Sequence, residues 1–181
     1  MLAMTVALLF VLCGCDVTIT TNGPNGSTTT TTSPSSATTA HIGERTKTQG
    51  CTAHGGLPDS ACTPGAIFST ATTQQICKSG YASSVRNVPS SEKDQVYAEY
   101  GITHHSAGQY EVDHLISLEL GGSNDIANLW PEAASPTPGF HQKDRVENYL
   151  HDQVCSGAMS LKDAQNEIAT KWLTAYNRMP Q

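Results

Sequence analysis

The stretch YEVDHLISLELGGSNDIANLW, residues 110–130, decides the fold class. Its first half alternates apolar and other residues, which predicts a strand over residues 110–120. The Gly-Gly-Ser-Asn turn that follows reverses the chain, so we expect residues 126–130 to return as a second short strand. Within the first strand an acid, Asp113, stands next to an imidazole, His114. Two such polar groups inside an apolar strand need a chemical reason.

Helical patterns flank this strand-turn-strand unit. An N-cap serine and an acidic first turn predict a short helix over residues 91–100. Helical spacing of apolar residues predicts a helix over residues 141–155, and a capping pattern starts a last helix at Ser160. Residues 51–91 are rich in Gly, Pro, Ser and Thr, so we expect loops there and one short helix near residues 71–77. The expected buried stripes are Val146, Leu150 and Val154 in one long helix and Ala164, Ile168 and Trp172 in the other. This is an α+β fold class.

The two ends of the 181-residue chain differ in composition. Residues 1–15 form an apolar run shorter than the roughly 20 residues that cross a bilayer, and they are typical of an export signal. The run ends in LCGC, which resembles the bacterial lipoprotein cleavage box and nominates Cys15 for lipidation; an ordinary signal with incidental cysteines is the alternative. Residues 16–40 are almost entirely Thr, Ser, Asn, Gly and Pro, which indicates a flexible tether. A globular domain over residues 41–181 follows.

Cysteine usage agrees with export. The globular domain holds four cysteines, an even number, which favours two disulfides over free thiols. No C-x-x-C pair occurs there, which argues against a structural zinc site. Three pairings stay open, and we favour the one that closes a short Gly-Pro-rich loop and joins the front of the domain to its back. That pairing is Cys51 with Cys62 and Cys77 with Cys155.

The residues around the turn suit hydrolysis of a phosphodiester bond. This reaction needs an activated water and neutralisation of charge on the phosphate. A neutral imidazole such as His114 can take the proton of the water near physiological pH. A carboxylate such as Asp113 can bind a divalent cation that leaves positions open for phosphate. An amide on the paired strand, Asn128, can hold the imidazole in one tautomer.

A long ordered pattern carries a family resemblance. The run YEVDHLISLELGGSNDIANLWPE, followed by HQKDRVENYLHDQVCSG, resembles the HNH nucleases, whose active site is a ββα-metal fold. The resemblance covers roughly residues 110–155. The pieces CTPGAIF, QQIC and SVRNVP are similar to those of exported bacterial members. The resemblance implies a small α+β domain built around a ββα-metal unit, with additional short helices and disulfides.

The resemblance also implies roles for individual residues. Asp113 matches the first metal ligand, and His114 matches the general base that activates water. Asn128 matches the middle amide, which orients that base or shapes its loop. His141, at the start of a helix, matches the last histidine, a metal ligand. The cofactor implied is one divalent metal ion, with Mg²⁺, Mn²⁺, Zn²⁺ and Ni²⁺ all open.

A Pro-rich connection makes the gap before His141 longer than in compact members of the family. Asp144, one turn further along the helix, is therefore a substitute metal ligand. Lys143 is a candidate contact to a phosphate oxygen. The implied activity is that of a metal-dependent endonuclease acting on nucleic acid, with DNA favoured and RNA left open. The implied location is the extracytoplasmic side of a bacterial membrane, with the lipid anchor holding the enzyme to the cell envelope.

The net charge of −6 limits how strongly nucleic acid could bind, because proteins that grip nucleic acid present a basic surface. A local patch can still make a few phosphate contacts, so we expect weak, salt-sensitive and sequence-independent binding. Its candidates are Arg86, Lys93, Lys143 and Arg145.

Two other functional classes compete with the nuclease. A catalytically inactive ββα scaffold could serve as a binding or structural module of the cell envelope. A hydrolase with a Ser or Cys nucleophile is disfavoured, because no G-x-S-x-G elbow is present and the cysteines are expected to be oxidised.

Overall fold

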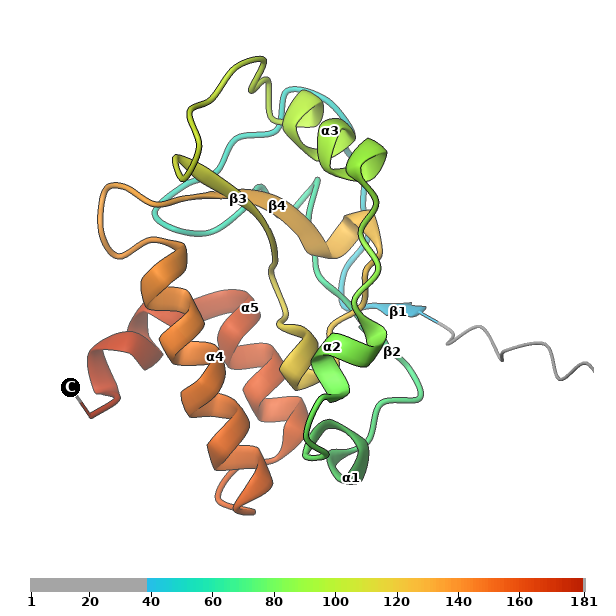
Figure 1. Cartoon of the computed structure of the whole chain (residues 1–181), viewed down its shortest axis with the longest axis vertical. Coiled ribbons are helices and arrows are strands. Elements are labelled where there is room, and N and C mark those ends of the chain that lie inside the picture. Colours follow the sequence, from blue (N-terminus) through green and yellow to red (C-terminus); the bar gives the residue numbers. More distant parts are fainter. Residues whose placement is uncertain (1–38, 181) are drawn as a thin grey trace, which may run out of the picture. The chain divides into compact units, whose positions relative to one another are not determined.

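The structure is that of a small mixed helix and strand domain (Figure 1). The computed structural model describes residues 39–180. The expected leader at residues 1–15, Cys15, and all but the last two residues of the expected tether lie outside the described residues. The strands are β1 (Thr39–His41), β2 (Ala66–Phe68), β3 (Tyr110–His114) and β4 (Leu129–Ala133). The α-helices are α1 (Thr73–Ile76), α2 (Tyr81–Val85), α3 (Ser90–Glu99), α4 (Phe140–Cys155) and α5 (Leu161–Arg178), and the short 3₁₀ helices are η1 (Leu118–Leu120) and η2 (Ile126–Asn128).

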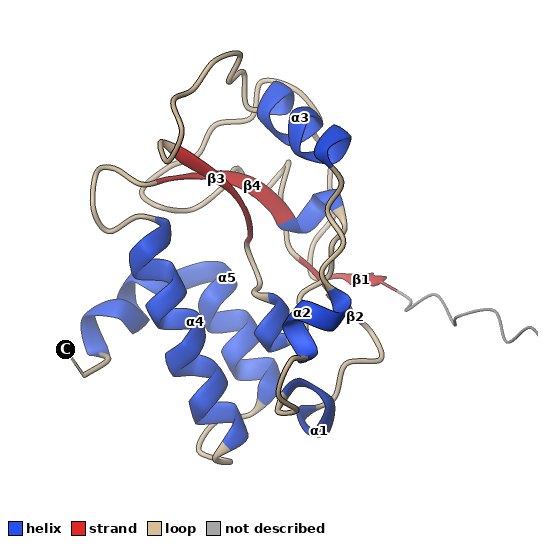
Figure 2. Ribbon diagram, viewed as in Figure 1, coloured by secondary structure: helices blue, strands red, loops and turns tan. Residues whose placement is uncertain are grey.

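The antiparallel pair of β3 and β4 separates two layers of helices (Figure 2). Helix α3 lies on one side, where Val96 packs with Val112 and Leu129 of the strands in a small core. Helices α4 and α5 lie on the other side and enclose the larger core, to which the strand pair contributes Trp130. Because β4 crosses between the layers, its side chains alternate between the two cores. None of the helices within residues 39–180 combines the length and apolarity needed to cross a membrane.

Strand β3 is shorter than the sequence pattern predicts, because it ends at His114 rather than near residue 120. The hydroxyl of Ser117 accepts a hydrogen bond from the Glu119 amide and starts η1. The turn then brings two backbone segments into close approach, since a Cβ at Gly122 would lie 1.7 Å from the carbonyl oxygen of Ile116. The second strand is also displaced: η2 occupies the residues expected to begin it, and the strand starts at Leu129.

The long helices agree closely with the expected ones. The predicted stripes of α4 and α5 are buried, and they pack against each other in the larger core. Helix α5 contains one residue with non-helical backbone angles, Lys171. The next residue, Trp172, is completely buried and donates its indole N–H to the carbonyl of Gly56 at 2.7 Å. This hydrogen bond ties the loop after β1 to the last helix.

Both expected disulfides are confirmed. Cys51 is bonded to Cys62, and Cys77 is bonded to Cys155. The second bridge joins the end of α1 to the last residue of α4, so it connects segments 78 residues apart. Two disulfides suit a domain exposed to an oxidising environment.

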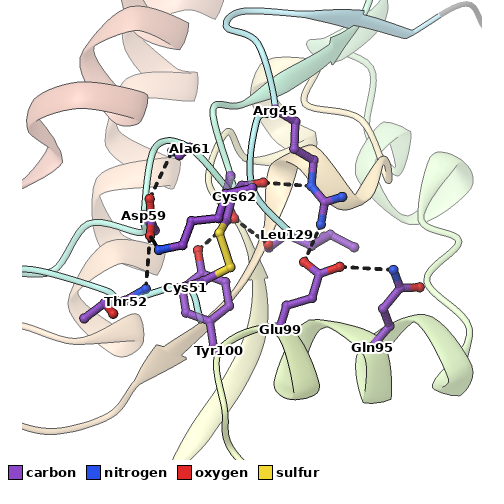
Figure 3. Close-up of a disulfide and its surroundings, with 12 residues drawn as sticks. Arg45, Cys51, Thr52, Asp59, Ala61, Cys62, Gln95, Glu99, Tyr100 and Leu129 are labelled. Atoms are coloured by element: carbon purple, nitrogen blue, oxygen red, sulfur yellow. Dashed lines mark hydrogen bonds and ion pairs between the residues drawn. A yellow bond between two sulfur atoms is a disulfide. The ribbon is translucent and has the colours of Figure 1, made fainter. Parts of the chain in front are cut away.

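The first disulfide sits in a polar network that fixes the early loop to α3 (Figure 3). Arg45 donates to the Cys62 carbonyl at 2.9 Å and forms an ion pair with Glu99 of α3. The amide of Cys51 donates to the carbonyl of Glu99 at 3.0 Å. The adjacent Thr63 hydroxyl donates to the carbonyl of Leu129 at 3.0 Å, which anchors the loop to the first residue of β4.

Candidate active site

Asp113 and His114 end strand β3 and turn to opposite sides of it. The Asp113 carboxylate accepts a hydrogen bond from Lys143 of α4 at 2.6 Å. The His114 imidazole lies on the other side, with Nε2 3.3 Å from the side-chain oxygen of Asn124. Successive side chains of a strand alternate in this way, so the two groups meet different neighbours although they are adjacent in the chain.

Lys143 is the centre of a buried polar cluster and is 0% exposed. Its ammonium donates to Asp113 at 2.6 Å, to the backbone carbonyl of His114 at 2.8 Å and to Glu147 at 2.5 Å. An ammonium has three donors, so all three are used. Burial alone would lower the pKa of Lys143, but the surrounding carboxylates raise it well above its usual value. The side chain therefore stays charged and does not present its ammonium to solvent.

Three carboxyl groups around Lys143 respond differently to its charge. Burial is the largest single effect on the pKa of Asp113 and raises it, but the charge and hydrogen bond of Lys143, together with smaller effects of Glu132 and His114, hold that pKa below its usual value. Burial raises the pKa of Glu147 to about 7, against the opposing effect of Lys143. Burial raises the pKa of Glu132 to about 10. One ammonium therefore keeps Asp113 ionised, while Glu132 is a neutral acid at physiological pH.

The carboxyl group of Glu132 is stabilised by few direct polar contacts. It lies on β4 and is 1% exposed, and neither oxygen has a hydrogen-bond partner of normal geometry. Asp113 is near enough that hydrogen bonding and charge repulsion from it raise the Glu132 pKa further. A proton kept between these two carboxyl groups explains why two acids can lie so close together.

Replacing Glu132 with glutamine is expected to stabilise the domain increasingly as the pH rises. Since the folded-state pKa is above the unfolded one, folded Glu132 retains a proton that the unfolded chain releases above about pH 4.5. The unfolding free energy of the wild type therefore falls as the pH rises towards the folded-state pKa of Glu132, whereas that of Glu132→Gln does not. The difference in unfolding free energy should widen between about pH 5 and about pH 9, by up to about 1.4 kcal/mol per unit. Urea unfolding without divalent ions measures it.

The matched control is Glu44→Gln, which removes an exposed carboxylate. Its difference from the wild type should not change with pH. If the Glu132→Gln difference is equally flat, the buried carboxyl is ionised in the folded protein and the description of the cluster fails.

Asn124 determines which nitrogen of His114 carries the proton. Its side-chain NH₂ donates to the carbonyl of Val85 at 2.7 Å, and its side-chain oxygen accepts from the amide of Asn87 at 3.1 Å. These two bonds fix the orientation of the amide, so the oxygen faces Nε2 of His114. Nε2 must then be the protonated nitrogen, and Nδ1 carries the lone pair. Nδ1 has no hydrogen-bond partner within the described part of the chain.

The imidazole of His114 is neutral at physiological pH. It is 1% exposed, and burial lowers its pKa to about 4 although the Asp113 carboxylate opposes this shift. A neutral imidazole with a free Nδ1 can accept a proton, which is the property required of a general base. Nδ1 is buried, so a water molecule reaches it only after a local movement of the surrounding residues.

Asn128 shapes the loop and does not touch the imidazole. Its completely buried amide donates to the carbonyls of Ile116 and Ser123, each at 2.9 Å, and its oxygen accepts from the Ile116 amide at 2.9 Å. Of the two roles that the resemblance implies for this position, the contacts agree with loop shaping. Asn124 holds the imidazole instead. Its place in the turn next to the glycines was the available signal, but sequence reasoning did not single it out.

His141 and Asp144 lie at the start of α4, where both are exposed. The ring of His141 is 4.2 Å from that of Phe140, measured between centroids. Burial, and then the charge of Asp113, raise the pKa of Asp144, and the same two effects raise that of Glu111 on β3. A bound cation would relieve the mutual repulsion among these carboxylates. Within residues 39–180, however, the donor atoms of Asp113, His141 and Asp144 do not all lie within 4.8 Å of one another.

The predicted residues fall into two groups. Asp113, Lys143 and the His114 backbone are joined by hydrogen bonds, and Asp144 and His141 are close enough to interact electrostatically with each other. Asp144 also feels the charge of Asp113. Sequence reasoning did not single out two members of the buried cluster, Glu132 and Glu147.

A second group of ligand-type side chains lies at the end of α4. Within residues 39–180, Cys77, His151 and Cys155 are the one set of three such residues whose donor atoms lie within 4.8 Å of one another. The two sulfurs are bonded to each other, and the His151 Nε2 lies 3.1 Å from the carbonyl oxygen of Ile76. Zinc binds thiolates, so the oxidised protein does not offer these sulfurs to a metal.

Comparisons with known protein families, curated proteins and solved structures found no match.

Proposed function

We propose that residues 41–181 form a metal-dependent endonuclease of the HNH type that hydrolyses phosphodiester bonds in nucleic acid, with DNA as the favoured substrate. The observation that carries the proposal is the state of His114, a neutral imidazole with its proton on Nε2 and a lone pair on Nδ1. We assign β3, β4 and α4 to the ββα-metal unit. Their order in the chain and the bond between Lys143 of α4 and Asp113 of β3 support this assignment.

In the proposed reaction His114 is the general base. Nδ1 takes a proton from a water molecule as the water oxygen bonds to phosphorus. The phosphorus bond to the leaving oxygen breaks, and that oxygen takes a proton from solvent. Asn124 keeps the imidazole in the required tautomer, because a proton on Nδ1 would place two lone pairs, those of Nε2 and the Asn124 oxygen, against each other.

The metal ligands would be Asp113 of β3 together with His141 and Asp144 of α4. The ion would neutralise charge on the phosphate and on the leaving oxygen. Lys143 holds the Asp113 carboxylate in place through a 2.6 Å hydrogen bond and keeps it ionised. Its second contact, to the carbonyl of His114, fixes the end of the strand that carries the base.

The proposed setting is the extracytoplasmic side of a bacterial membrane. Cys15 would carry the lipid anchor, and residues 16–40 would tether the enzyme to it. The two disulfides are compatible with an exported domain. With a net charge of −6, binding of nucleic acid would be weak and salt-sensitive, with little dependence on sequence.

Two observations favour a second candidate, an inactive ββα scaffold used for binding in the cell envelope. His114 is 1% exposed, and the cation that contacts Asp113 is the ammonium of Lys143. A purely structural cluster would have the same two properties.

Removal of divalent metal separates the two candidates. The purified protein should nick circular plasmid DNA in Mg²⁺ or Mn²⁺, stop on addition of EDTA, and recover when metal is restored, since the ion neutralises charge on the phosphate. A parallel assay with single-stranded RNA tests the other substrate. Conversion of supercoiled to relaxed and linear plasmid on a gel is the measurement.

Asp113→Asn, purified identically, controls for contaminating nucleases and should leave the plasmid supercoiled. Cleavage that persists in EDTA would contradict a metal-dependent enzyme. Intact DNA and RNA under every condition would favour the inactive scaffold.

A further inference from the structure

The loop after α2, which Asn124 connects to the His114 imidazole, carries an exposed arginine. Arg86 follows α2, and its backbone amide donates to the carbonyl of Ala82 at 3.1 Å. Its side chain is exposed and makes no hydrogen bond or ion pair with the described residues. A long cationic side chain held at a fixed backbone position, with its charge free, is available to an anionic ligand.

Asn124 places this arginine beside the imidazole. Its amide binds the backbone on both sides of Arg86, at the carbonyl of Val85 and at the amide of Asn87. The same amide oxygen lies 3.3 Å from Nε2 of His114. One half-buried amide thus connects the loop of Arg86 to the proposed general base through three contacts.

The charges around Arg86 agree with this placement. Its guanidinium lowers the pKa of His114, of Glu111 and of Asp144, so its charge reaches all three groups. These groups span both sides of β3 and the start of α4. The charge of Arg86 therefore acts on the base and on the acidic residues of the site.

The other members of the expected basic patch are placed differently. Lys143 is buried and fully bonded to protein groups. The guanidinium of Arg145 lies 5.8 Å from the centre of the Tyr176 ring, against α5. Lys93 is exposed on α3, and its charge is not among those that shift the pKa values of His114, Glu111 or Asp144. Arg86 is the exposed basic residue of this set that acts on the site.

We infer that Arg86 binds the phosphate group of the substrate next to His114 and holds it during attack by water. The inference rests on the proposed function and names the residue that receives the anion. A guanidinium can donate two parallel hydrogen bonds to phosphate oxygens, which an ammonium cannot do in the same geometry. This anchoring does not need Lys143, whose role is internal to the protein.

Arg86→Ala, Arg86→Lys and the matched control Arg145→Ala test the inference. With a fluorescent oligonucleotide, Arg86→Ala should lower kcat by about 10²-fold or more, as does loss of other groups that stabilise charge in a transition state. Arg86→Lys should recover a part of this loss. Arg145→Ala should cleave at the wild-type rate. Thermal unfolding of each variant checks that the fold is retained.

A binding measurement makes the test independent of cleavage. Inorganic phosphate is titrated into metal-free protein while the backbone amides of residues 85–87 and 124 are followed by NMR. Saturable shifts are expected for the wild type and for Arg145→Ala, and they should be absent in Arg86→Ala.

The two readouts separate the inference from the proposed function. If phosphate binding requires Arg86 but the wild type does not cleave, the anion site is supported and the proposed nuclease activity is contradicted. Cleavage by the wild type with normal rates in Arg86→Ala keeps the nuclease and overturns the inference. Slow cleavage by Arg86→Ala, combined with no phosphate-induced NMR shifts in the wild type, also overturns the inference. Arg86 would then only balance the charges of nearby acids. If neither cleavage nor binding is seen, both fail.

Discussion

Replacement of His114 with alanine is expected to reduce the rate of phosphodiester cleavage by about 10²-fold to 10⁴-fold, the usual contribution of a positioned general base. The lone pair on Nδ1 is the group lost. His104 and His105 lie in the exposed loop before β3, and His141 is assigned to the metal. Initial rates of cleavage of a labelled duplex, in saturating Mg²⁺, measure the effect. Far-ultraviolet circular dichroism and urea unfolding show whether the buried substitution keeps the fold.

Two further variants make this prediction specific. His114→Gln retains a polar side chain of similar size that can still donate to Asn124, and it should be as inactive as His114→Ala. His104→Ala removes an exposed imidazole and should leave the rate unchanged. Wild-type cleavage by a folded His114→Gln protein would show that the imidazole is not the base.

The helices and disulfides could be predicted because local rules specify them. Val146, Leu150 and Val154 recur at helical spacing, and Ser160 caps the last helix as expected. The disulfide pairing followed from loop length and from an even number of cysteines. The helices depend on residues that are close in the chain, and the disulfides depend on the number and spacing of the cysteines, which the sequence shows directly.

The early end of β3 could not be predicted from alternation alone. Val112, His114 and Ile116 are all buried as a strand face would be, yet β3 stops at His114. The reason is the long-range competition of Asn128, whose side chain takes both the amide and the carbonyl of Ile116. A side-chain amide that takes the place of a neighbouring strand does not change the apolar alternation of the segment it binds, so the sequence pattern does not reveal it.

The buried charge cluster left a signal that was not used. Lys143 precedes Val146 by three residues and Leu150 by seven, so it belongs to the buried stripe of α4. Glu132 follows Trp130 at the spacing of one strand face. Both positions predict burial, and a buried lysine near buried acids predicts an ion cluster. The prediction that Lys143 contacts phosphate at the surface followed its residue type and not its position in the buried stripe of the helix.

Replacement of Lys143 with methionine is therefore expected to destabilise the domain by about 3–5 kcal/mol, the usual cost when one partner of a buried ion pair is removed. Methionine fills a similar volume, so the loss reports charge more than packing. The carboxylates of Asp113 and Glu147, whose side chains are 13% and 15% exposed, would be left without their cation. Urea unfolding at about pH 7, without divalent ions, measures the change against the wild type.

The matched control, Lys93→Met on α3, removes an exposed lysine and should change stability by no more than about 0.5 kcal/mol. Adding Asp113→Asn to Lys143→Met should return part of the lost stability, because the amide carries no charge to be left unpaired. A solvent-exposed lysine that only contacts substrate would behave like Lys93: its loss would slow cleavage and leave unfolding unchanged. An unfolding free energy of Lys143→Met equal to that of the wild type would therefore contradict the buried cluster, since the three acceptors of its ammonium have no other cation to replace it in the described domain.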